Sequence, residues 1–314
     1  MRVAPPLETM HHSDRSPHTL CDGSKGFVRV FSDEFEGSRG LNTSTWQVVH
    51  GWSARTHSMT ADAWGHTDNV YVEDGALVLR TRWPTDAEKR VHPDATVFTG
   101  AVTSRALHTF APGRLCISAR LPGRASAGGG GPNQGLWPAH WLMPSHANDF
   151  DDSLGCWPDL GEIDLMEMVN GEPSWYGTYH WNSKRHHPAD AHDEQRCSVV
   201  TPGGGGGHAE VQRCAPLERW DSEWNEYAVE WDGETHVSFY VNGVLLGTAT
   251  AGVTPPSTAH EGASAATDRP AFYDDPMFLM LQTAVGGSWP GAVSASTDLP
   301  TFHRIDYVRY ERYV

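Results

Sequence analysis

Positively charged residues are scarce in this sequence, and their scarcity excludes one large class of partner. The chain carries 23 Lys and Arg against 39 Asp and Glu, which gives a formal net charge of −16. Nucleic-acid binding requires clustered Lys and Arg to neutralise phosphates, and the sequence shows no such cluster. We therefore expect no nucleic-acid partner. The same balance disfavours a heavily sulfated polysaccharide, unless a local basic patch overrides it.

Long hydrophobic runs are also absent. No segment reaches the roughly 20 apolar residues that a membrane-spanning helix needs, so we expect no membrane partner. The first residues, MRVAPPLETMHHSDRSPHT, lack the apolar core of a signal peptide. We expect residues 1–26 to form a disordered extension and residues 27–314 to form a single domain.

Sustained helical periodicity is missing too, which argues against folds built on a parallel sheet with crossover helices. Two glycine runs, Gly128–Gly131 and Gly203–Gly207, lack the Lys-Ser/Thr pair of a phosphate loop and are expected to be flexible surface loops. We interpret Ser183–Pro216 as an insertion. Its histidines lack the spacing of a known metal motif, so surface histidines are favoured over a metal site. These are His186, His187, His192 and His208.

The five cysteines cannot all pair within one chain. Cys197 and Cys214 bracket the glycine-rich part of the insertion and are candidates for a disulfide. Cys116 lies in an apolar strand-like run and is expected to be a buried thiol. The sequence assigns no role to Cys21 or Cys156.

Turn dipeptides, by contrast, are frequent. Asp74-Gly75, Asp232-Gly233 and Asn242-Gly243 each separate two strand-like runs, and such pairs favour the tight turns of β-hairpins. The pattern predicts an all-β fold of two stacked antiparallel sheets. Thirteen Trp exceed what a core of this size usually takes. Indole faces stack on the C–H faces of sugars, so this excess suits a carbohydrate groove, although packing alone would also employ most of them.

Three acids lie within the strand-like run Gly161–Glu167, GEIDLME. In a regular strand Glu162 and Asp164 share one face and Glu167 points to the other. A β-bulge between Asp164 and Glu167 returns Glu167 to the shared face, and bulges are common beside active sites. Two carboxyls at short separation are what glycosidic-bond cleavage uses. From spacing alone, a solvated or metal-binding acidic strand is an equal alternative.

Three further blocks flank the acids in a fixed order: Gly135–Pro144 (GLWPAHWLMP), Gly177–Trp181 (GTYHW) and Leu281–Gly291 (LQTAVGGSWPG). Together with GEIDLME they resemble the laminarinase-like members of glycoside hydrolase family 16, over nearly the whole chain from Phe31 to Tyr310. The spacing E-x-D-x-x-E, with Met166 as the extra residue, resembles laminarinases and agarases. The runs GLWPAHW and VGGSWPG favour laminarinases.

The resemblance implies a β-jelly-roll sandwich of two antiparallel sheets, with a concave substrate groove. It implies a retaining endo-glycoside hydrolase that cleaves β-1,3-glucan or mixed β-1,3/1,4-glucan through a covalent glycosyl-enzyme intermediate. By this resemblance Glu162 is the nucleophile, Glu167 the general acid/base and Asp164 the helper between them. A retaining mechanism then requires Glu167 to hold a proton while Glu162 stays ionised.

Other functions remain open at this point. Related glucan-recognition modules lose the catalytic glutamates, so the presence of Glu162 and Glu167 favours an enzyme. A transglycosylase uses the same covalent intermediate but delivers it to a sugar hydroxyl. A galactanase of the agarase or carrageenase type is a further alternative within the family.

Several residues are candidates for substrate binding. Trp137 and Trp141 are four apart in a strand and share a face, which suits an aromatic floor; two core indoles are the alternative. By the resemblance, Trp157 and Trp289 bracket the scissile bond and His180 lies near the acid/base. The full set of candidates is Asn69, Arg105, Trp137, Trp141, Trp157, His180 and Trp289. His140 replaces the more usual Phe and is expected to face away from Trp137 and Trp141.

The resemblance implies no cofactor for catalysis and a structural calcium far from the groove, with Asp306 as the candidate ligand. One carboxylate is weak evidence for a cation that takes about six or more oxygens. The resemblance also implies an extracellular monomer that binds β-glucan, although the sequence shows no signal peptide.

Overall fold

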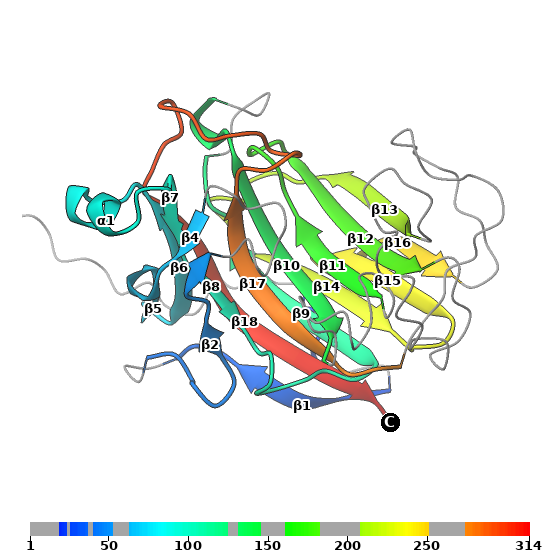
Figure 1. Cartoon of the computed structure of the whole chain (residues 1–314). Coiled ribbons are helices and arrows are strands. Elements are labelled where there is room, and N and C mark those ends of the chain that lie inside the picture. Colours follow the sequence, from blue (N-terminus) through cyan, green and yellow to red (C-terminus); the bar gives the residue numbers. More distant parts are fainter. Residues whose placement is uncertain are drawn as a thin grey trace, which may run out of the picture.

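The chain folds into two β-sheets packed face to face (Figure 1). The computed structural model describes residues 19–23, 26–36, 40–52, 63–124, 131–145, 161–182, 208–250 and 274–314. No helix in these ranges is long and apolar enough to cross a membrane.

The larger sheet has 11 strands, in the order β16-β15-β14-β9-β18-β6-β7-β4-β3, with β1 also paired to β18 and β5 to β6. All its pairings are antiparallel except that of β4 with β7. Its strands are β1 (Phe27–Asp33), β3 (Gly51–Trp52), β4 (Ala63–Gly65), β5 (Val70–Glu73), β6 (Ala76–Arg82), β7 (Val97–Thr99), β9 (Gly113–Arg120), β14 (Asn225–Trp231), β15 (His236–Val241), β16 (Val244–Thr250) and β18 (Thr301–Tyr313).

The smaller sheet has seven strands, all antiparallel, in the order β13-β12-β11-β10-β17-β8-β2. In Figure 1 its central strands lie in front of β9, β14 and β15. Its strands are β2 (Gln47–Val48), β8 (Ala101–Thr103), β10 (Leu136–Pro144), β11 (Glu162–Glu167), β12 (Ser174–Asn182), β13 (His208–Pro216) and β17 (Met277–Val285). The predicted pair of stacked antiparallel sheets is confirmed.

The hairpin turns form where the dipeptides predict them. Asp74 and Gly75 join β5 to β6 with φ values of 52° and 73°, and Asn242 and Gly243 join β15 to β16 with 50° and 75°. A type I′ turn requires positive φ at both central residues, which is why Asp-Gly and Asn-Gly occur here. The loop from β14 to β15 is longer, and the Asp232 carboxylate closes it by accepting three backbone N–H groups, from residues 234 to 236.

Two sequence predictions about elements are wrong. The segment Ser183–Pro216 is not an insertion throughout, because its last nine residues form β13 and pair with β12 along their length. Residues 183–207, with the second glycine run, lie outside the described residues. A short helix, α1 (Asp86–Val91), was not predicted; its capping box, in which Thr85 and Glu88 satisfy each other's backbone N–H groups, is the signal that would have revealed it. Short 3-10 turns, η3 (Thr67–Asn69) and η4 (Gly131–Asn133), add to the regular structure.

The main core lies between the two sheets. Large aromatic side chains fill it, and each removes about 150–250 Å² of surface from water. Part of the tryptophan excess is therefore structural. The tryptophans that are fully buried are Trp46, Trp175, Trp181, Trp220 and Trp231.

A buried histidine pair joins the sheets inside this core. Nε2 of His140, on β10, lies 2.9 Å from Nε2 of His303, on β18, and the two rings stack. Burial lowers the pKa of His140 well below the usual value and that of His303 to about 3, so both rings are neutral. His140 therefore faces the opposite sheet, away from Trp137 and Trp141, as predicted.

Acid should weaken the fold through this pair. The folded pKa values lie below the value of about 6.5 for an unfolded histidine, so below that pH the unfolded chain binds protons that the folded chain does not. The stabilisation is complete above that pH and is lost as the pH falls, with a slope of up to about 2.7 kcal/mol per pH unit for two sites. Urea unfolding of the wild type and of His140→Phe between about pH 7 and pH 5 measures this slope. We expect a shallower slope in the variant, and equal slopes would contradict the assignment.

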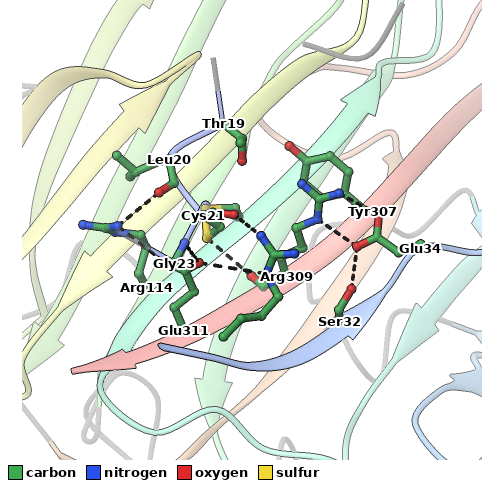
Figure 2. Close-up of polar contacts among 12 residues, drawn as sticks. Thr19, Leu20, Cys21, Gly23, Ser32, Glu34, Arg114, Tyr307, Arg309 and Glu311 are labelled. Atoms are coloured by element: carbon green, nitrogen blue, oxygen red, sulfur yellow. Dashed lines mark hydrogen bonds and ion pairs between the residues drawn. A yellow bond between two sulfur atoms is a disulfide. The ribbon is translucent and has the colours of Figure 1, made fainter. Parts of the chain in front are cut away.

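The segment Thr19–Gly23, here called the N-terminal clasp, lies on the outer side of the larger sheet (Figure 2). Cys21 forms a disulfide with Cys116 of β9, and both cysteines are fully buried. The expectations of a free Cys116 thiol and of disorder up to residue 26 are therefore wrong for these residues. Residues 1–18 lie outside the described part of the chain.

Buried charges of the sheet hold the backbone of the clasp. The Leu20 N–H donates to Glu226 of β14 at 2.6 Å, and the Gly23 N–H donates to Glu311 of β18 at 2.7 Å. Arg114 of β9 donates to the Leu20 carbonyl oxygen at 3.1 Å. Both carboxylates are fully buried, so the clasp supplies hydrogen bonds that buried charges need.

The disulfide predicted between Cys214 and Cys197 does not form. Cys214 is a free, exposed cysteine on β13. Its expected partner Cys197, like Cys156, lies outside the described residues.

Candidate active site

The three acids of GEIDLME lie on β11, between β10 and β12 in the middle of the smaller sheet (Figure 1). Gly161 leads into the strand with a φ of 84°, a conformation that favours glycine. Glu162, Asp164 and Glu167 are only 9%, 4% and 8% exposed. A solvated acidic face is therefore excluded for this strand.

A β-bulge places the three carboxyls on one face. Asp164 pairs with Thr178 and Glu167 pairs with Tyr176, so two residues of β11, Leu165 and Met166, oppose the single residue Gly177 of β12. Directly paired residues point to the same face, and Thr178 and Tyr176 share a face of β12. The predicted bulge between Asp164 and Glu167 is confirmed. Leu165 and Met166, between the acids, are both in the main core.

Asp164 joins Glu162 to His180. Its Oδ2 lies 3.0 Å from His180 Nε2, and it shares a hydrogen bond with Glu162. Burial and the neighbouring Glu162 charge raise the pKa of Asp164, while His180 opposes that rise. A protonated Asp164 donates its O–H to Glu162, which keeps the Glu162 carboxylate ionised and oriented.

The Glu167 carboxyl has its own hydrogen-bond donors, separate from those of Asp164. Trp137 Nε1–H donates to its Oε1 at 3.0 Å, and the Thr178 hydroxyl donates to its Oε2 at 3.4 Å. Burial, and then the charge of Asp164, raise the pKa of Glu167 above its usual value. Glu167 therefore keeps a proton to higher pH than an exposed glutamate does, which is the property of a general acid.

The apolar face beside the acids contains the predicted aromatic Trp141. It packs with Met143, Phe278 and Met280 on the face of β10 and β17 that points away from the main core. Arg105 is half-buried, and its guanidinium carbon lies 5.7 Å from the centre of the Phe278 ring. The structure thus brings Trp141 and Arg105 to the face that carries the acids.

Asn69 is placed differently from the prediction. Its side chain is fully buried, and its Oδ1 accepts hydrogen bonds from Arg80 at 2.9 Å and Arg82 at 3.0 Å. A side chain that water cannot reach presents no surface to a sugar. The structure therefore assigns Asn69 to the positioning of two arginines on β6.

Comparison with known proteins places this geometry in context. No family model matches the chain. Glucan endo-1,3-beta-glucosidase A1 of Niallia circulans is 27% identical over 98% of this chain. Keratan-sulfate endo-1,4-beta-galactosidase of Sphingobacterium multivorum is 28% identical over 89%, and the beta-glucanase of Rhodothermus marinus is 27% identical over 96%. The chain spans 41%, 54% and 88%, respectively, of the lengths of these curated relatives.

Solved structures share the fold. The laminarinase catalytic domain of Thermotoga maritima superposes with a TM-score of 0.65 at 24% identity, covering 92% of this chain and 100% of that one. The catalytic domain of an endo-1,3-beta-glucanase from Thermotoga petrophila gives 0.64 at 25% identity, with coverage of 91% and 98%. SCLam, a non-specific endo-beta-1,3(4)-glucanase from family 16, gives 0.65 at 22%, with 93% of each chain covered. The resemblance to glycoside hydrolase family 16 is confirmed.

The block VGGSWPG positions one further aromatic residue. Gly286 and Gly287 have φ values of 79° and 104°, and they turn the chain out of β17. Trp289 then lies half-buried against Trp137, with ring centres 5.3 Å apart. Trp157, the other residue expected to bracket the scissile bond, lies outside the described residues.

Two places among the described residues bear on metal binding. Asp306 is buried on β18, in the sheet that does not carry the acids. Within the described ranges its carboxylate belongs to no cluster of three or more potential metal-ligating side chains, so a calcium ion there, which takes about six or more oxygens, would need backbone carbonyls for most of its ligands. The one cluster found there joins Glu162, Asp164 and His180, whose donor atoms lie within 4.8 Å of one another. The carboxyl of Asp164 already forms hydrogen bonds with both of these neighbours.

Two residues of the site were missed by sequence reasoning. Thr178 donates to Glu167, and Tyr176 is the register partner of Glu167. Alternation along β12 puts both on the face of His180. The same alternation, applied to the GTYHW block and the residue before it, is the signal that would have identified them.

The Trp137 hydrogen bond lowers the proton affinity of Glu167, in opposition to the larger effect of burial. An N–H donor favours the ionised carboxylate, so Trp137→Phe should raise the pKa of Glu167, by up to about one unit. Catalysis needs this acid protonated, so the alkaline limb of kcat/KM should move to higher pH in the variant. The pH profile on a β-glucan measures the shift, with Trp289→Phe as the control that leaves the hydrogen bond in place. A limb that stays fixed or moves to lower pH would contradict this role.

Proposed function

We propose that this chain is an endo-acting β-glucanase that hydrolyses β-1,3-glucan or mixed β-1,3/1,4-glucan with retention of anomeric configuration. The observation that carries the proposal is the bulged strand β11, which presents three buried acids on one face and gives Glu167 a raised pKa. Relatives named as glucan endo-1,3-beta-glucosidase and beta-glucanase support the substrate class.

In the first step Glu162 attacks the anomeric carbon of the sugar at the cleavage site. The bond from that carbon to the bridging oxygen breaks, and Glu167 gives its proton to the departing oxygen. The product is an ester between the Glu162 carboxylate and the sugar. Asp164 holds Glu162 in place before the attack through their shared hydrogen bond.

In the second step Glu167, now ionised, takes a proton from water. The water oxygen attacks the anomeric carbon, the ester bond breaks and Glu162 leaves as a carboxylate. Two inversions at one carbon give net retention. The proton affinity of Glu167 suits both steps, because one residue must act first as an acid and then as a base.

A galactanase is the second candidate, because one relative is named as a keratan-sulfate endo-1,4-beta-galactosidase. That polymer is anionic, whereas this chain has a net charge of −16. Like charges disfavour association, so the glucanase is preferred.

A substrate panel tests the proposal. Laminarin, lichenan, agarose, κ-carrageenan and keratan sulfate are each incubated with the protein, and the products are separated by length. We expect internal cleavage of laminarin or lichenan, with the β-anomer appearing first by NMR and no change when EDTA is added. Cleavage confined to a galactan would move the protein to the second candidate, and an α-anomer first product would refute retention.

We also propose that the protein works outside the cell. The buried Cys21–Cys116 disulfide supports this, because such bonds persist in oxidising compartments.

A further inference from the structure

Three aromatic side chains from separate parts of the fold meet at one end of the site. Trp137 comes from β10, Tyr176 from β12 and Trp289 from the loop after β17. Trp289 lies between the other two, with ring centres 5.3 Å from Trp137 and 5.2 Å from Tyr176, and both contacts are edge-to-face. We call this cluster the aromatic wall.

The aromatic wall lies beside Glu167, because two of its three residues are neighbours of that acid. Tyr176 pairs directly with Glu167, and Trp137 donates its N–H to the Glu167 carboxylate. Glu162 instead pairs with His180, four residues farther along β12. Four residues of strand span about 13 Å, so the wall stands at the Glu167 end of the row of acids.

The geometry of a retaining displacement indicates which sugar lies at the Glu167 end of the row of acids. The nucleophile, the anomeric carbon and the departing oxygen lie roughly in line in a retaining displacement, and the acid stands beside the departing oxygen. The line from the Glu162 carboxylate through the anomeric carbon to the departing oxygen therefore runs towards Glu167. The sugar that carries the departing oxygen lies beyond it, against the aromatic wall.

Exposure divides the wall into a support and a contact surface. Trp137 is only 5% exposed, whereas Tyr176 and Trp289 are partly buried. The Tyr176 hydroxyl also hydrogen-bonds with Cys214 on β13, which fixes its ring on the strand. Two partly exposed rings in mutual contact, one of which also packs against the buried Trp137, are suited to stacking on a sugar face.

We propose that Tyr176 and Trp289 form the platform for the leaving-group sugar and, in the second step, for an acceptor sugar. Tyr176 is then a specificity-determining residue that sets the ratio of sugar transfer to hydrolysis. In transfer, an acceptor hydroxyl replaces water: its oxygen bonds to the anomeric carbon, the ester to Glu162 breaks and its proton passes to Glu167. This inference rests on the proposed function.

The test uses 2,4-dinitrophenyl β-laminaribioside as donor and laminaribiose as acceptor. The aryl leaving group needs little help from a sugar platform, so the ester forms in every variant. We expect Tyr176→Ala to lower the ratio of transfer product to hydrolysis product by roughly five- to tenfold. Tyr176→Phe, which keeps the ring, should retain most of the ratio.

Two further variants keep the test decisive. Tyr71→Ala removes a partly buried tyrosine of β5, in the opposite sheet, and should leave the ratio unchanged. Tyr176→Leu replaces the ring with a compact apolar side chain and serves if the alanine variant does not fold. An unchanged ratio in a folded, hydrolytically active Tyr176→Ala or Tyr176→Leu would overturn the inference alone. A wild type inactive on every β-glucan of the panel would overturn the proposed function as well.

Discussion

Glu162→Ala and Glu167→Ala will each lose nearly all hydrolysis of laminarin while keeping the fold. Without Glu162 no ester forms, and turnover should drop by at least about 10⁴-fold, as for other enzymes that lose a nucleophile. Without Glu167 the departing oxygen leaves without a proton, which should cost about 10²- to 10⁴-fold. Reducing-sugar release and circular dichroism measure the two properties. Wild-type turnover in either variant would refute the assignment.

Azide distinguishes the two roles. Small enough to enter a space left by a missing carboxylate, it can replace either group. With Glu162→Ala and an activated β-glycoside, azide attacks the sugar once and should give an α-glycosyl azide. With Glu167→Ala, azide attacks the ester and should give the β-glycosyl azide. The same product from both variants would mean that the roles are not divided as proposed.

Asp164→Asn is the matched comparison for these variants. The asparagine amide still donates a hydrogen bond to Glu162, as the protonated Asp164 does. We expect a smaller loss than in either glutamate variant.

Removing the Cys21–Cys116 disulfide should have the largest effect on stability. It joins residues that are 95 apart in sequence, so it removes much freedom from the unfolded chain. We expect Cys21→Ala/Cys116→Ala to lower the free energy of unfolding by about 2–5 kcal/mol. Urea unfolding with and without a reductant measures the loss, and the reductant should destabilise only the wild type.

Cys214→Ala is the control for that comparison. Cys214 is exposed and forms no disulfide, so its replacement should lower the unfolding midpoint far less than loss of the Cys21–Cys116 bond does. The double variant should also keep its turnover number wherever it remains folded, because the clasp and the acids lie on different sheets. Equal stability of the double variant and the wild type would contradict a stabilising role for the clasp.

The hairpin turns and the β-bulge could be predicted from the sequence, because each depends only on residues that are adjacent in the chain. Asp74-Gly75 and Asn242-Gly243 adopt the positive φ values that their turns need, and such turns depend on adjacent residues alone. The bulge at Asp164 was predictable for a similar reason. Three acids can share a face only if the strand alternation is broken between them.

Features that depend on distant partners were not predicted. Cys116 pairs with a residue 95 positions away, in a stretch whose composition is that of a disordered tail. His140 was expected to point inward, but its partner His303 is on the last strand of the other sheet. Asn69 was expected to be a substrate-binding residue, yet its Oδ1 accepts hydrogen bonds from two arginines of β6. In each case the missing information was the identity of the side chain on a neighbouring strand.

The N-terminal clasp also fixes an order of events. Its carboxylate partners Glu226 and Glu311 come from β14 and β18, far along the chain. During synthesis, residues 19–23 leave the ribosome long before these partners exist, and contacts of such long sequence separation close late. Residues 19–23 therefore reach their full set of contacts only after β18 has been made.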